Sequence, residues 1–241
     1  MNLIAELPKK QPFANQTVPD VEQNQLLASM PHEERIQIVS YLEEVDFSLN
    51  QVLCEAGTTP SYMYFPTTAV ASLLYFTESG QSSEIAIVGN DGVVGMSLFL
   101  SGTNLPYQAI VQSAGKGFRV RAQTAINIFN SSNAMQNILL QYSLSMMCQI
   151  SKTAICNRHH TVDQQLCRRL LVALDRLSCS KMEMTHEMLA KMLGVRRESI
   201  TQSASKLQTA GAIIYRRGLI NVLDRKALES RACECYDVVK N

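Results

Sequence analysis

Four polar side chains between residues 197 and 202 carry groups that can read the edges of base pairs. Arg197 can donate two hydrogen bonds to guanine O6 and N7, and Glu198 can accept one from cytosine N4. Gln202 can pair with adenine N6 and N7. Small side chains dominate the surface around them, so another polymer could approach closely. We therefore predict base contacts by Arg197, Glu198, Thr201 and Gln202.

To reach base pairs, these side chains must lie on a helix that is held at a fixed angle to a second helix. Residues 196–209 are predicted to be helical, with Ile200, Ala204 and Leu207 on one face. A shorter helix is expected before them, with Thr185 as its N-cap. Its apolar stripe is formed by Met188, Leu189, Met192 and Leu193. Gly194 can adopt the left-handed conformation that a sharp turn requires, so the pattern predicts a helix-turn-helix.

Two short apolar runs follow, at residues 212–215 and 219–223, on either side of Arg216, Arg217 and Gly218. This pattern is typical of a β-hairpin with a basic tip, which is a wing suited to the phosphate backbone. The phosphate contacts that we predict are Thr185, Arg196, Lys206, Arg216 and Arg217.

The run GVRRESITQ at residues 194–202, with the preceding helix and the following wing, resembles the DNA-binding domain of the Crp–Fnr transcription regulators. In that family the recognition helix opens with an Arg-Glu pair, which Arg197 and Glu198 match. Gln202 stands where the catabolite activator type has arginine, so the resemblance does not supply the operator sequence. The family pattern extends from about Leu26 to Leu228. It implies a homodimer that binds an inverted repeat in double-stranded DNA and regulates transcription, with RNA polymerase as a candidate further partner.

The segment from residue 47 to residue 121 has the texture of a small sandwich or jelly-roll barrel, because short apolar runs alternate with glycines. A short helical segment is expected before it, at residues 24–41. The runs expected to be strands are 51–54, 62–65, 70–76, 84–88, 94–100, 107–113 and 118–121. The resemblance to the Crp–Fnr family implies that this barrel is a β-roll like cyclic-nucleotide-binding domains. The expected fold class is therefore α+β: an N-terminal β-roll (jelly-roll), a long dimerisation helix and a C-terminal winged helix-turn-helix.

The roll lacks the residues that bind cyclic AMP in the family, namely a Gly-Glu pair and an Arg-Ser or Arg-Thr pair about eleven residues later. The matching positions read Gly95-Met96-Ser97 and residues 105–108, and residues 92–115 contain no charged side chain. A buried phosphate without a counter-charge carries a large desolvation penalty, so we expect no useful affinity for cyclic AMP. Met96, Ser97 and Tyr107 could instead line a pocket for a neutral effector; the alternative is that the apolar residues here are core.

No metal and no cofactor are expected. An iron–sulfur cluster needs clustered thiolates, whereas residues 1–130 contain only Cys54. Haem would need an axial ligand, and His32 is the one histidine in that half. His159 and His160 are interpreted as solvated or hinge residues. Cys233 and Cys235 form a CxC pair, which alone is weak evidence for metal or redox chemistry.

A long helix is predicted over residues 131–158, starting at a Ser131 or Ser132 cap. Its apolar residues recur at intervals of three and four, as in a coiled-coil seam. The alternative is a helix that packs only on its own barrel. The expected dimer-interface residues are Met135, Leu139, Tyr142, Met146 and Ile150. The expected domains are therefore a poorly ordered leader at 1–20, the roll at 21–130, the dimerisation helix at 131–158 and the DNA-binding domain at 159–241.

Charge is segregated along the 241 residues although the net charge is only +1. Residues 1–130 hold 6 Lys and Arg against 12 Asp and Glu, whereas residues 131–241 hold 16 against 9. A basic half suits a polyanionic partner. The sequence has no membrane span and no signal peptide, and its seven cysteines are odd in number and irregularly spaced, which favours a cytoplasmic location.

Two other classes of function are alternatives to a DNA-binding regulator, namely an enzyme and a protein-binding scaffold. An enzyme is not expected, because the sequence offers no nucleophile motif, no P-loop and no metal-ligand cluster. A protein-binding scaffold, in which the winged domain docks a partner, remains the alternative to DNA binding. Salt dependence separates the two, because contacts to phosphates weaken steeply with added salt.

Overall fold

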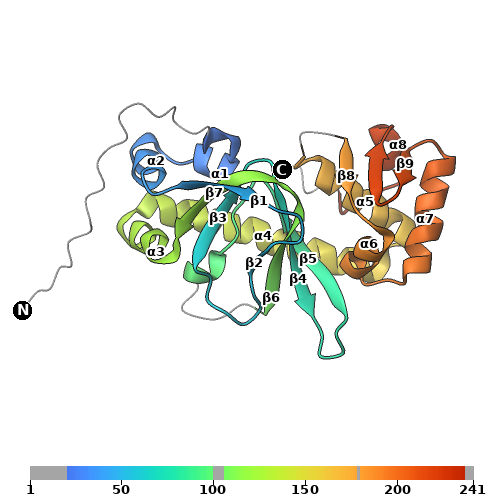
Figure 1. Cartoon of the computed structure of the whole chain (residues 1–241), viewed down its shortest axis with the longest axis horizontal. Helices are drawn as coiled ribbons and strands as arrows, with labels where there is room; N and C mark the ends of the chain where they lie inside the picture. Colours follow the sequence, from blue (N-terminus) through green and yellow to red (C-terminus); the bar gives the residue numbers. More distant parts are fainter. Residues whose placement is uncertain (1–20, 100–105, 178–179, 237–241) are drawn as a thin grey trace, which may run out of the picture.

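The computed structural model describes residues 21–99, 106–177 and 180–236, and Figure 1 shows a β-roll and a winged domain connected by one long helix. The expected fold class is confirmed, because these parts follow one another in the predicted order. The leader predicted at residues 1–20 lies outside the described residues. In the described ranges, no helix has both the length and the apolar character of a membrane span.

Two antiparallel sheets form the β-roll, with strand orders β1-β7-β3 and β2-β6-β4-β5. Met63, Phe65 and Ala109 are fully buried between strands and helices, so the apolar faces of both sheets point into the domain. The strands are β1 (Glu43–Phe47), β2 (Val52–Cys54), β3 (Tyr62–Pro66), β4 (Val70–Phe76), β5 (Ser82–Val88), β6 (Tyr107–Ser113) and β7 (Gly115–Arg121).

The strand predicted at residues 94–100 is wrong. Val94 makes a single bridge to Tyr64, and the chain then forms a short 3-10 helix, η2 (Met96–Phe99). The reason lies at Gly95, which has a φ of +110° and passes so close to β3 that a Cβ there would lie 3.1 Å from the Tyr62 carbonyl oxygen. The backbone therefore turns away where a strand would continue.

The helical segment expected at residues 24–41 is divided at Pro31 into α1 (Gln25–Ala28) and α2 (His32–Val39), after the 3-10 helix η1 (Val21–Gln23). Asn24 caps α1, since its Oδ1 accepts from the Leu27 amide. Its Nδ2 donates to the carbonyl oxygens of Pro66 and Gly92, which ties this segment to the roll.

The long helix is α4 (Asn133–His159), which follows α3 (Ala122–Ser131). Ser132 is its N-cap and accepts from the Met135 amide at 3.1 Å. Three of the five residues predicted for the dimer seam, Met135, Leu139 and Tyr142, are instead buried in the core of their own roll. The Tyr142 hydroxyl donates to the Val93 carbonyl oxygen at 3.2 Å. Met146 and Ile150 are half-buried against the same domain.

A different face of α4 is exposed. Leu140, Leu144 and Met147 are each more than 60% exposed, and Ile155 is 53% exposed. At 100° per residue these side chains lie roughly 140° round the helix axis from the predicted seam. Apolar residues therefore cover two faces of α4, and its own roll occupies only one of them.

The winged domain is built on α5 (Val162–Leu174), whose N-terminus has a capping box formed by Thr161 and Gln164. Leu166, Leu170 and Leu171 of this helix are fully buried. The remaining elements are β8 (Lys181–Glu183), α6 (His186–Leu193), α7 (Arg197–Thr209), β9 (Ile213–Arg216), β10 (Leu219–Val222) and α8 (Arg225–Glu229).

A buried ion pair connects the two domains. Arg169 of α5 lies with its Nε 2.6 Å from Glu84 Oε1 of β5, and both side chains are less than 10% exposed. Its Nη2 also donates to Glu84 Oε2 at 2.8 Å and to Gln112. The Ser72 hydroxyl donates to the same carboxylate at 2.5 Å. Arg176 adds a second, partly exposed pair with Asp91 at 2.6 Å.

Removing the carboxylate of Glu84 should destabilise the whole chain. Glu84→Gln leaves the Arg169 charge buried without a counter-ion, which costs about 3–5 kcal/mol. We expect the double variant Glu84→Gln/Arg169→Met to recover most of the loss in urea unfolding. Glu44→Gln is the control, because Glu44 and Lys116 form an exposed pair at 3.2 Å that should contribute less than about 1 kcal/mol. Equal losses for Glu84→Gln and Glu44→Gln would contradict the coupling.

Candidate nucleic-acid interface

The helix-turn-helix forms as predicted between α6 and α7. Thr185 caps α6 by accepting from the Met188 amide at 3.1 Å. Gly194 ends that helix in the left-handed conformation with φ 65° and ψ 32°. The Val195 amide then donates to the Ala190 carbonyl oxygen, so the turn is fixed within two residues of the helix end.

The two faces of α7 differ as the sequence predicts. Ile200, Ala204 and Leu207 are buried against the domain core. The four candidate base-reading residues project on the other side, and Figure 1 places α7 at the outer edge of the winged domain. All four are exposed: Arg197, Glu198, Thr201 and Gln202.

The hydroxyl of Thr201 is already bonded within the protomer. It donates to the Arg197 carbonyl oxygen at 3.1 Å, and it accepts from His186 Nδ1 at 3.0 Å. Because both bonds are internal, the methyl group of Thr201 is the part best placed to contact a thymine methyl group. Arg197, Glu198 and Gln202 keep their polar groups free for other contacts in the described part of the chain.

His186 joins the recognition helix to the wing and was not singled out by the sequence. Its ring stacks on Tyr215 of β9, with centroids 4.1 Å apart and an interplanar angle of 16°. Nδ1 carries the proton that bonds Thr201, whereas Nε2 is buried without a partner among the described residues. Burial and the nearby Arg197 charge lower the pKa of this imidazole from its ordinary value of 6.5. This lowered pKa favours the neutral form of His186.

The wing is a hairpin of β9 and β10 whose tip is the pair Arg217 and Gly218. Both residues have positive φ, at 49° and 82°, as a two-residue type I′ turn requires. Arg216 and Arg217 are exposed at the tip, where they can contact phosphate. The sequence missed β8, which pairs with β10 and makes the wing a three-stranded sheet.

Of the remaining candidate phosphate contacts, Thr185 and Arg196 are exposed beside the turn. Lys206 is exposed too, but its ammonium lies 2.8 Å from the Asp163 carboxylate of α5. Hydrogen bonds from Lys206 and Ser203 hold the pKa of Asp163 below its usual value. Such a surface pair is weak, so a phosphate can displace the carboxylate at little cost.

The three candidate effector-pocket residues are buried or half-buried. Met96 is 9% exposed and packs in the core shared by the roll and α4, and Ser97 is also buried. Tyr107 is half-buried against the second roll cluster, and this burial raises the pKa of its hydroxyl to about 12. The apolar residues here thus contribute to packing. Leu100 and Leu105 lie outside the described residues.

Two family models match this chain, one on either side of α4. Residues 44–132 match the cyclic nucleotide-binding domain, and residues 164–231 match the Crp-like helix-turn-helix domain. Among curated proteins, none matches the sequence.

Solved structures share the fold over most of the chain. A protein from Eubacterium rectale assigned to the crp/fnr family of transcriptional regulators has a TM-score of 0.67 at 15% identity, covering 87% of this chain and 98% of its own. FixK2 from Bradyrhizobium japonicum has a TM-score of 0.65 at 14% identity, with coverage of 80% and 98%. A CRP/FNR family transcriptional regulator from Thermus thermophilus has a TM-score of 0.64 at 20% identity, with coverage of 79% and 98%.

The depressed pKa of His186 makes stability depend on pH. Because the folded state binds the proton less tightly than the unfolded state, stability should fall as the pH drops below about 6.5, the ordinary imidazole value. His186→Asn keeps a donor near Thr201 but cannot titrate. Thermal unfolding compared at about pH 7.5 and about pH 5.0 should show a smaller loss for this variant than for the parent chain. Identical pH profiles for His186→Asn and the parent chain would contradict the assignment of this pH dependence to His186.

Proposed function

Because the chain belongs to the Crp–Fnr family of transcription regulators, we propose that it binds an inverted-repeat operator as a homodimer, with one α7 helix in each of two successive major grooves. The observation that carries this proposal is the exposed polar face of α7 on a helix whose other face is buried. A helix of this kind presents side chains to base edges without unfolding any part of the domain.

The proposed base contacts follow from side-chain chemistry. Arg197 donates two hydrogen bonds to a guanine, and Glu198 accepts from a cytosine. Gln202 reads an adenine or another base, and Thr201 contributes its methyl group. Phosphates would be held by Thr185, Arg196, Lys206, Arg216 and Arg217.

The exposed face of α4 is the proposed dimer interface. Leu140, Leu144, Met147 and Ile155 are spaced so that they line one side of the helix. A two-fold axis along α4 would bury these side chains against their copies, as in a coiled coil. The proposed interface uses a different face of α4 from the seam expected from the sequence, but the proposed assembly is still a homodimer.

Cyclic AMP is not the proposed effector. The segment between η2 and β6 supplies no charged side chain for a cyclic phosphate, and the side chains of Met96 and Ser97 are buried. The effector is thus a different compound or none at all. We also propose that the protein contacts RNA polymerase. Its proposed location is the cytoplasm.

Selection of bound duplexes from a random pool tests the function. The enriched sequences should be inverted repeats, and their affinity should fall with added salt at a slope of about −0.9 per neutralised phosphate. A protein-docking scaffold would enrich no sequence, and its complexes would respond little to salt.

Arg197→Ala should weaken binding to the selected operator by about 1–3 kcal/mol and relax discrimination at one base pair in each half-site. Titration of operators that differ at single positions measures both effects. Arg217→Ala is the contrasting variant: it should weaken all duplexes alike and reduce the salt slope by about 1. If Arg197→Ala behaves like Arg217→Ala, then Arg197 contacts phosphate and the base assignment is wrong.

Leu144→Glu should dissociate the dimer, because it places like charges opposite each other in a desolvated interface. Light scattering should show a shift from dimer to monomer, with a large loss of operator affinity. Ile36→Glu is the matched control, since Ile36 is 58% exposed on α2, outside the proposed interface. A variant Leu144→Glu that remains dimeric would rule out this face of α4.

A further inference from the structure

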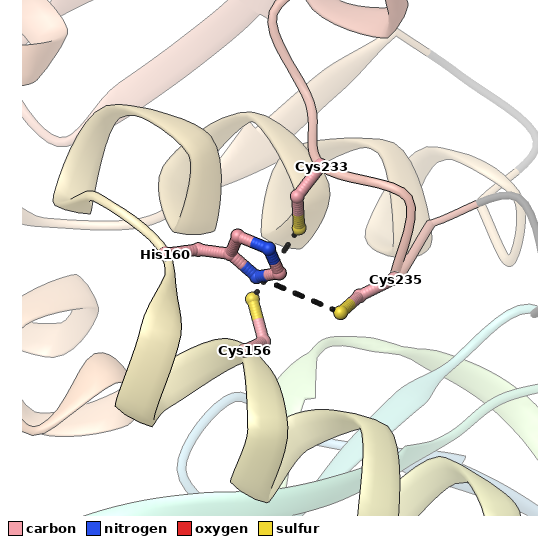
Figure 2. Close-up of side chains that lie close together, drawn as sticks. All are labelled: Cys156, His160, Cys233 and Cys235. Carbon is pink, nitrogen blue, oxygen red and sulfur yellow. Dashed lines mark hydrogen bonds between the residues drawn. The ribbon is translucent and has the colours of Figure 1, made fainter.

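Four side chains that can bind a metal meet where α4 ends, although the sequence places them in two distant segments. Cys156 and His160 lie one helical turn apart at the end of α4, and Cys233 and Cys235 belong to the segment after α8 (Figure 2). Their ligand atoms all lie within 4.8 Å of one another. The sequence by itself presents only the CxC pair and predicts no metal; the fold brings a third cysteine and a histidine to that pair.

Two of the six separations between ligand atoms match the edges of a tetrahedron around one ion, and all six are at most 4.8 Å. The sulfur atoms of Cys156 and Cys233 are 3.6 Å apart, and Cys235 Sγ lies 3.6 Å from His160 Nδ1. With Zn–S bonds of about 2.3 Å and Zn–N bonds of about 2.0–2.1 Å, tetrahedral angles give edges of about 3.8 Å between sulfurs and about 3.6 Å from sulfur to nitrogen. A cluster of several irons would divide the four side chains among different irons and so spread the ligand atoms further apart.

The imidazole of His160 is oriented as a ligand. Figure 2 shows the ring pointing among the three sulfur atoms. Nδ1 faces Cys235, whereas Nε2 lies 3.2 Å from the Glu234 carboxylate. A proton on Nε2 donated to Glu234 leaves the Nδ1 lone pair free. This is the arrangement by which a carboxylate orients a metal-bound histidine.

The surroundings suit the charge that such a site would carry. Three thiolates and one divalent ion sum to −1. Arg168 is 6% exposed and bonds to the Cys235 carbonyl oxygen and the Thr153 hydroxyl, but to no carboxylate in the described ranges. Ionised thiolates would therefore supply the negative charge that this buried guanidinium lacks. Gln165 donates to the carbonyl oxygens of Cys156 and His160, which fixes the helix end that carries two ligands.

We propose that Cys156, Cys233, Cys235 and His160 bind one zinc ion in a closed, tetrahedral Cys3His site. Structural zinc sites have four protein ligands of this kind, with no open position for substrate. The ion would tie the C-terminal segment to the joint between α4 and α5. The winged domain would then be held to the dimerisation helix by coordination bonds in addition to packing.

Metal content of the full chain tests the proposal directly. The protein should be purified without oxygen and without added chelator, and zinc, iron and acid-labile sulfide should be measured on the same sample. We expect about one zinc per chain, and little iron or sulfide. Replacement by Co²⁺ should give the visible absorption typical of tetrahedral thiolate coordination.

Variants then identify the ligands. Cys233→Ser, Cys235→Ser and His160→Asn should each lose most of the bound zinc. Cys167→Ser and Cys148→Ser are the controls: Cys167 is buried in α5 and Cys148 is exposed on α4, and neither belongs to the group of four. Both controls should keep about one zinc per chain. A strong chelator should lower the thermal midpoint of the parent chain but not that of Cys233→Ser, because only a state that binds the ion gains stability from it.

Three results would overturn the proposal. The first is a chain that holds no zinc as purified and takes up none from added Zn²⁺ under reducing conditions. The second is iron with acid-labile sulfide in place of zinc. The third is zinc loss in Cys148→Ser or Cys167→Ser equal to that in Cys233→Ser. None of these readouts involves DNA, so they are independent of the proposed function.

Discussion

The placement of the recognition helix depends on a buried arginine–carboxylate pair between the two domains. Arg169 extends from α5, the first helix of the winged domain, and meets Glu84 on β5 of the roll. Ser72 donates a hydrogen bond to the Glu84 carboxylate, and Gln112 accepts one from Arg169. A buried charge pair contributes little net stability over an apolar contact, but it strongly disfavours any arrangement in which the charges separate. The pair therefore selects one orientation of the winged domain on the roll.

In the proposed homodimer, the long helix α4 would transmit this orientation to a second copy of the chain. One face of α4 supplies core residues to the roll, with Tyr142 fitting over Gly92, where any Cβ would lie 2.4 Å from the tyrosine hydroxyl oxygen. The other face carries exposed leucine and methionine. The same helix thus contacts the roll and leads through α5 to α7, and in the proposed homodimer it would also set the dimer axis. The proposed zinc ion at the end of α4 would reinforce the joint between α4 and α5.

Local chemistry made the helix-turn-helix and the wing predictable. Gly194 and Thr185 specify a turn and a cap from a few neighbouring residues, and the Arg217–Gly218 pair specifies a tight hairpin. The face of α4 that enters the core was not predictable from spacing, because apolar residues lie on both sides of that helix. The strand β1 was missed because its sequence, EEVDF, is largely charged and exposed.

The four proposed metal ligands show a different limit of prediction from sequence. Cys156 and Cys233 are 77 residues apart in sequence, and only the return of the chain after α8 brings them together. A CxC pair and a cysteine one helical turn before a histidine are each weak evidence for a metal site. The periodicity of the sequence does not indicate that the two motifs meet in the fold. The role of His186 was not predicted for the same reason, because its partners Thr201 on α7 and Tyr215 on β9 come together only in the folded domain.

Hydroxyl-radical footprinting of the chain on its selected operator tests the central claim most directly. If α4 pairs two copies and each α7 enters a major groove, both strands should show two protected patches. These should lie on one face of the duplex with centres roughly 34 Å apart. A single protected patch, or two patches separated by half a turn, would contradict the account.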